Sequence, residues 1–115
     1  MREGLYRIHF RAHSPIVGTG EFMGSGVVYL HNGILSGGDN TFYYSGKYEL
    51  DQDRIAATAT IKGHTSIPGS RSIFVTETAD VKLKGSTSID GQINAFGETL
   101  HSAIRFEVGL QWLAA

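Results

Sequence analysis

The chain has 115 residues, which fits one domain spanning residues 1–115. Ten Lys and Arg residues balance eleven Asp and Glu residues, which argues against nucleic acid or an anionic membrane surface as a partner, since both select basic patches. There is no Cys, so disulfides and thiolate chemistry are excluded. No signal-peptide core is visible at the start, and no run approaches the ~20 apolar residues of a membrane helix. We therefore expect a cytoplasmic protein.

The first predicted element is a strand over residues 4–13, "GLYRIHFRAH". Tyr6, Ile8 and Phe10 fall on one face, and Arg7 and His9 fall on the other. This period of two is typical of a strand with one dry face. Residues 54–62 and 103–113 alternate in the same way, with Phe106 on the dry face, and none of the three segments has a helical period.

The segment "GTGEFMGSG" at 18–26 resembles a phosphate loop but lacks the third glycine of the motif and a following helix. Its glycines instead indicate a bent strand or a bulge. Further on, Asn32-Gly33 is a type I′ hairpin signal, because both central residues of that turn need positive φ. A two-residue turn would pair Leu30 with Leu35 and Val28 with Gly37, which places apolar residues on one face.

The next strand is predicted over residues 42–50, followed by a turn at 51–53. Its inward set is Phe42, Tyr44, Gly46, Tyr48 and Leu50. Glu49, Asp51 and Asp53 recur at every second position, so they would share one outer face if strand geometry persisted to Asp53.

Two more strands are predicted around residues 72–84 and 91–96, after an irregular link at 64–72. Glu77 falls in phase with the apolar residues of the first of these strands. An unbroken strand would point Glu77 inward, where it would anchor a ligand or act as an acid or base. A bulge at 76–80 would instead turn it to solvent.

About eight short antiparallel strands predict a small all-β domain. The first choice is an up-and-down β-barrel, lipocalin-like or calycin-like, because closure removes exposed sheet edges and gives all dry faces one interior. A β-sandwich is the alternative. An eight-stranded barrel is either filled by side chains or holds one small ligand.

The sequence shows no convincing catalytic or metal motif. There is no G-x-S-x-G elbow, no HExxH, and the Asp-rich segment at 51–55 lacks the glycine of a calcium loop. A metal site assembled from His31, His64 and His101 stays open, with structural or surface histidines preferred. We expect no cofactor and no enzymatic activity, and an enzyme using Glu77 or His101 is the third alternative.

Four segments carry a resemblance to a known family: "GLYRIHF", "GSGVVYLHNGILSGGD", "YYSGKYELDQD" and "IKGHTSIPGS". Over its first two-thirds the chain resembles the GrlR-type negative regulators of type III secretion and their bacterial relatives. The resemblance implies a calycin-like barrel, a homodimer, and action by holding a transcriptional activator without touching DNA. The regulator's acidic partner-contact loop, Glu-Asp-Glu-Asp, corresponds here to Leu50, Asp51, Gln52 and Asp53, so only the two aspartates match in charge.

Two non-enzymatic functions follow from these observations. The first is a non-enzymatic module that acts by protein contact, with Glu49, Asp51 and Asp53 as partner-binding residues. The alternative is a carrier or sensor of a small hydrophobic molecule in the barrel interior. The residues that would line such a ligand cavity are Tyr6, Tyr44, Tyr48, Glu77 and Phe106. With the first function we expect a filled barrel whose internal space stays well under the ~300 Å³ of a small-molecule pocket.

Overall fold

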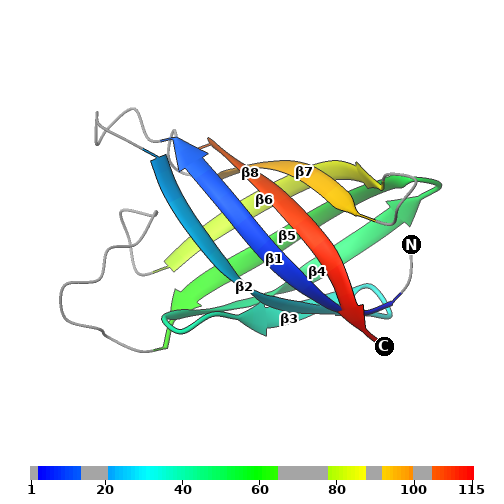
Figure 1. The fold of residues 1–115 in the computed structure, drawn as a ribbon, viewed down its shortest axis with the longest axis horizontal. Helices are drawn as coiled ribbons and strands as arrows, with labels where there is room; N and C mark the ends of the chain where they lie inside the picture. Colours follow the sequence, from blue (N-terminus) through cyan, green and yellow to red (C-terminus); the bar gives the residue numbers. More distant parts are fainter. Residues whose placement is uncertain (1–2, 14–20, 65–77, 88–91, 100–104) are drawn as a thin grey trace.

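The computed structural model describes residues 3–13, 21–64, 78–87, 92–99 and 105–115. Within these ranges the chain forms eight strands, each antiparallel to the next. They are β1 (Gly4–His13), β2 (Glu21–His31), β3 (Ile34–Gly38), β4 (Phe42–Asp51), β5 (Arg54–Gly63), β6 (Thr78–Thr87), β7 (Ile93–Thr99) and β8 (Arg105–Ala114). Because β8 also pairs with β1, the sheet closes into a barrel (Figure 1). The predicted up-and-down barrel is confirmed, and its closure excludes the sandwich.

The strands predicted around 72–84 and 91–96 correspond to β6 and β7. Each extends three residues further toward the C-terminus than predicted, to Thr87 and Thr99. Of the irregular link at 64–72, only His64 is described. Glu77 and His101 lie outside the described residues. The hypotheses that rest on their side chains therefore stay predictions.

The β2–β3 hairpin has the predicted register. Leu30 faces Leu35 and Val28 faces Gly37. The central residues Asn32 and Gly33 have φ values of 51° and 77°, the positive pair that a type I′ turn requires.

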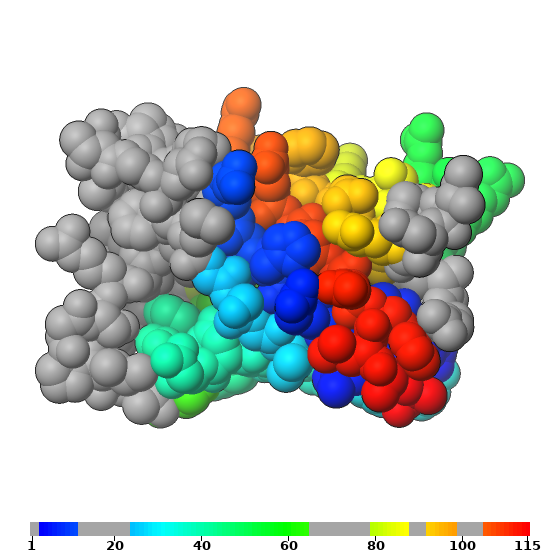
Figure 2. All heavy atoms as spheres, viewed as in Figure 1, coloured from blue at the N-terminus to red at the C-terminus, as the bar shows by residue number. Residues whose placement is uncertain are grey.

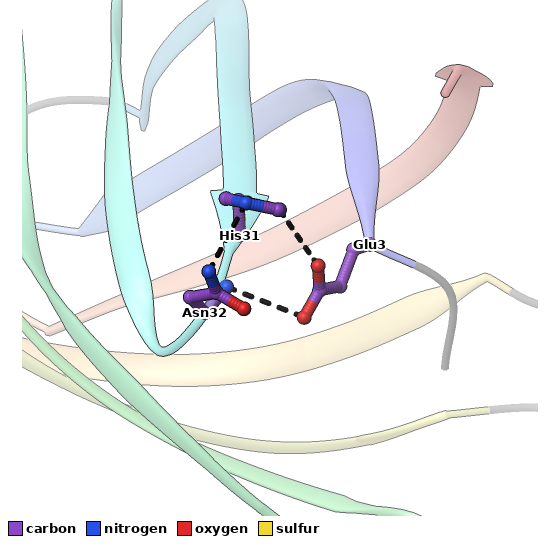
Figure 3. A network of polar contacts seen from close by, with 3 residues as sticks. All are labelled: Glu3, His31 and Asn32. Atoms are coloured by element: carbon purple, nitrogen blue, oxygen red, sulfur yellow. Dashed lines mark hydrogen bonds and ion pairs between the residues drawn. The ribbon is translucent and has the colours of Figure 1, made fainter.

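The start of β1 is tied to this turn (Figure 3). His31 Nδ1 lies 2.7 Å from Glu3 Oε2, and the Asn32 backbone N–H donates to Glu3 Oε1 at 3.2 Å. The start of β1 and the end of β8 both lie at this end of the barrel (Figure 1), which we call the terminal end. The opposite end, where β3 meets β4, is called the distal end.

The inner face of the barrel holds the buried apolar side chains, in the alternating positions that the sequence predicts. This core comprises Tyr6, Val28, Leu30, Leu35, Tyr44, Tyr48, Ile55, Ala57, Ala59, Val81, Ile93, Ala95, Phe106, Val108 and Leu110. The prediction that Leu50 points into the core is wrong, since 42% of it is exposed. It lies three residues beyond Lys47, the last β4 residue that pairs with β3, so only β5 flanks β4 at this point.

The glycines at 24 and 26 lie within β2, as expected of a bent strand rather than a phosphate loop. A Cβ added at Gly24 would lie 2.5 Å from the Phe10 ring, so the glycine makes room for that ring. A Cβ at Gly26 would lie 2.6 Å from the backbone oxygen of Gly38. These contacts let β1, β2 and β3 approach closely around a tight bend.

Candidate ligand cavity

The barrel interior is hollow. A cavity of about 350 Å³ runs from the core toward the distal end. The apolar residues that line it come from every strand: Ile8, Phe10, Val28, Leu30, Leu35, Phe42, Tyr44, Ile55, Ala57, Ala59, Ile61, Val81, Leu83, Ile93, Ala95, Phe106, Val108 and Leu110. Gly24, Ser25, Asp39, Asn40 and Thr41 complete the described lining. On the near face, the side chains of β1, β2 and β8 cover the interior (Figure 2).

The cavity exists because many inward positions carry small side chains. Ala59 on β5 pairs with Gly46 on β4, and Ala95 on β7 pairs with Gly85 on β6. In each pair only the alanine carries a side-chain atom, a single Cβ, so neither pair extends far into the interior. The space is more than twice the ~150 Å³ of an apolar cavity that binds benzene, and it reaches the lower bound of ordinary ligand pockets.

One polar group lies at the distal end of the otherwise apolar cavity. It is formed by the turn Asp39–Thr41 between β3 and β4, together with Tyr44, and we call it the polar turn. Asp39 Oδ1 accepts hydrogen bonds from the backbone N–H groups of Thr41 and Phe42, both at 2.8 Å. Asp39 Oδ2 accepts a hydrogen bond from the Tyr44 hydroxyl. The carboxylate therefore closes its own turn and fixes the orientation of a buried tyrosine.

The surroundings of Tyr44 keep its hydroxyl protonated. Burial raises the pKa of Tyr44 well above its usual value near 10, and the hydrogen bond to Asp39 and the negative charge of that carboxylate raise it further. His64 adds a contact from the end of β5, because its Nε2 lies 2.8 Å from the backbone oxygen of Asp39. That nitrogen must carry a proton to donate to a carbonyl.

The structure brings together only part of the cavity set predicted from sequence. Tyr44 and Phe106 line the cavity. Tyr6 and Tyr48 are buried but are not among the lining residues. The prediction of a filled interior is wrong, since about 350 Å³ exceeds the expected limit.

The sequence analysis did not predict Asp39 as a cavity residue and interpreted it only as part of a turn. A signal was present, because Asp39 continues the inward phase of Leu35 and Gly37. The same rule that identified the core residues thus places this carboxylate at the inner rim of the barrel.

The acidic residues Glu49, Asp51 and Asp53 are all exposed, at the tip of the β4–β5 hairpin. Glu49 and Asp51 share the outer face of β4. Asp53 does not extend this face, because the strand ends at Asp51 and Gln52-Asp53 forms a two-residue turn. The condition for three carboxylates on one strand face is therefore not met, and the three charges surround the tip instead.

A metal site that includes both His31 and His64 is excluded by the topology. His31 precedes β3 and contacts Glu3 at the terminal end, whereas His64 contacts Asp39, which follows β3 at the distal end. The two imidazoles therefore lie at opposite ends of the barrel.

No family model matches this chain, and no curated protein matches it. Within the described residues, no helix has the length and apolar character needed to cross a membrane. The fold and the cavity define the chain as a hollow eight-stranded antiparallel β-barrel whose apolar interior has one polar end.

Proposed function

We propose that the protein binds a small, largely apolar molecule inside the barrel and acts as its carrier or sensor. The observation that supports this is the cavity of about 350 Å³, whose described lining is largely apolar and has Tyr44 as its one buried polar side chain. Ligand pockets have this composition, with a few polar groups that orient the ligand in an apolar enclosure. An eight-stranded barrel that its own side chains do not fill has room for one small ligand.

The test is a titration with N-phenyl-1-naphthylamine, a neutral dye that fluoresces in apolar surroundings. We expect a saturable signal at one dye per chain. Ala95→Phe should weaken binding, because residue 95 lines the cavity and the added ring would occupy it. Asn94→Phe is the matched control, because residue 94 is the exposed neighbour on the same strand. A folded wild-type protein that gives no saturable signal, or equal binding by both variants, would reject the cavity as a binding site.

A second candidate function is binding of a protein partner through the acidic hairpin tip, as the family resemblance implies. The observation that favours it is that Glu49, Leu50 and Asp51 are all exposed on one projecting hairpin. Acidic groups that lie close together repel each other, and a basic partner surface would relieve that repulsion and speed association. With this function we propose a cytoplasmic homodimer that holds a transcriptional regulator.

The test of this second function replaces Glu49, Asp51 and Asp53 together by Gln and Asn and measures partner capture from the native cell extract. We expect the triple variant to capture less, and wild-type capture to fall as added salt screens the charges. Folding of the variant is checked by thermal melting. Capture of the same partner at the same level by the variant would show that the hairpin tip is not the contact site.

A further inference from the structure

We infer that the cavity selects a neutral ligand whose polar end is a hydrogen-bond donor, such as an aliphatic alcohol, over an anionic fatty acid of the same length. This inference rests on the proposed function of the cavity and adds the chemical class of its ligand. It is carried by the direction of one hydrogen bond, between Tyr44 and Asp39.

A phenol has one O–H to donate and lone pairs that accept. The Tyr44 hydroxyl donates to Asp39 Oδ2, and a carboxylate oxygen accepts. The donor of Tyr44 is thereby used inside the protein. What the hydroxyl still offers to a molecule in the cavity is an acceptor. A ligand with an O–H or N–H at its polar end satisfies it, whereas an ether or ester oxygen does not.

The Asp39 carboxylate sets the second part of the preference. It accepts from Thr41, Phe42 and Tyr44, so its charge is stabilised by three donors and does not require a cationic ligand. That negative charge still repels a second carboxylate brought into the same end of the cavity. Among the described lining residues there is no Lys, Arg or His that would offset the repulsion.

The geometry also leaves Tyr44 accessible from within. Gly26 lies opposite the hydroxyl, and a Cβ at that position would lie 3.1 Å from the Tyr44 oxygen. Among the other described lining side chains that could donate, Ser25 and Asn40 are exposed to water, and the hydroxyl of half-buried Thr41 donates to Asn40 Oδ1 at 3.4 Å. Tyr44 is therefore a buried lining residue whose hydroxyl already has a partner for its donor and keeps an acceptor for a ligand.

The experiment displaces the bound dye with three molecules at pH 8: 1-decanol, its isomer methyl nonyl ether, and decanoate. The alcohol and the ether have the same atoms and differ in whether the oxygen can donate. We expect 1-decanol to bind about three- to tenfold more tightly than the ether, the effect of one neutral hydrogen bond. Decanoate should bind at least about tenfold more weakly than the alcohol.

The Asp39→Asn variant distinguishes a role of Asp39 in ligand selectivity from a merely structural role. The Asn oxygen can keep the two backbone hydrogen bonds of the turn, while its NH₂ group replaces Oδ2 and donates to Tyr44. The tyrosine O–H is then released to donate into the cavity. The variant should bind the ether as well as or better than the alcohol, and it should gain about tenfold or more for decanoate as the repulsion disappears. Asn94→Asp, which makes the same amide-to-carboxylate change at an exposed position outside the described cavity lining, should leave the alcohol-over-ether ratio unchanged.

Each outcome has one meaning. If the dye binds but wild-type protein takes alcohol and ether equally, or if decanoate is the tightest of the three, the inference is overturned and the cavity function stands. If Asp39→Asn folds and keeps the wild-type order, the direction of the Tyr44 hydrogen bond does not set selectivity, which also overturns it. If neither the dye nor any of the three molecules binds, the proposed function fails, and the inference with it.

Discussion

Filling the cavity with protein atoms should stabilise the barrel. Ala59 is the best position, because it is buried, lines the cavity and pairs across the sheet with Gly46. Ala59→Leu adds three carbon atoms to this space. At ~0.8 kcal/mol for each buried methylene, their transfer from water contributes about 2.4 kcal/mol, and ordering the new side chain costs ~0.5–1 kcal/mol. The expected gain in the free energy of unfolding is therefore about 1.5–2 kcal/mol.

The assay is reversible denaturation in urea or by heat, together with the dye titration. At ~4 °C per kcal/mol, the melting temperature should rise by about 6–8 °C. Dye affinity should fall, because the leucine takes up part of the volume. Ala56→Leu is the control on the exposed outer face of the same strand, and it should change stability by no more than ~0.5 kcal/mol.

The opposite result would refute the reasoning directly. Forcing methylenes into a well-packed interior costs ~1–3 kcal/mol, because side chains and backbone must shift to make room. If Ala59→Leu destabilises the protein by that amount while Ala56→Leu does not, the space beside Ala59 is already filled. The hollow interior, and both inferences drawn from it, would then be withdrawn.

Three further predictions concern stability and assembly. Above pH 10 Tyr44 ionises in the unfolded chain but stays protonated in the folded one. The free energy of unfolding of the wild type should therefore fall by ~1.4 kcal/mol more per pH unit than that of Tyr44→Phe. Equal dependence on alkaline pH in urea denaturation of the two proteins would contradict this. Gln52→Gly should raise stability by about 0.5 kcal/mol, because Gln52 has a φ of 59° that glycine adopts freely, and a lower denaturation midpoint would count against it. Sedimentation at micromolar concentration should give a dimer mass, and a monomer at every concentration would reject the homodimer.

The sequence predicts the barrel well because its strands obey a rule that depends only on neighbouring residues. Side chains alternate faces along a strand, and the register follows from one turn with a strict φ requirement, Asn32-Gly33. The same local rule fails at Leu50, where burial depends on whether another strand lies opposite. That depends on the lengths of neighbouring strands, which alternation does not reveal.

The hollow interior is harder to predict because a cavity is a property of the sum of all inward side chains. The large inward tyrosines suggested a filled core, yet Tyr6 and Tyr48 are buried without filling the cavity. The glycines and alanines in the same inward phase, among them Gly46 and Ala59, carried the contrary signal. Weighing the two requires knowing which residues lie at the same height in the barrel, and this follows from strand tilt and stagger.

The two proposed sites should act independently, although β4 connects them. Tyr44 lies near the distal end of this strand and Asp51 at its last residue, so seven residues separate them by about 23 Å along the strand. This exceeds both the ~7–10 Å within which substitutions usually interact and the ~8 Å Debye length at physiological salt. Neutralising Glu49, Asp51 and Asp53 should therefore change dye affinity less than about twofold, and Asp39→Asn should leave partner capture intact. If the triple variant shifted dye affinity by tenfold or more, ligand and partner would be coupled, and the coupling would be reciprocal, as expected of a sensor. An unchanged affinity would fit a carrier whose cavity and outer contacts serve separate purposes.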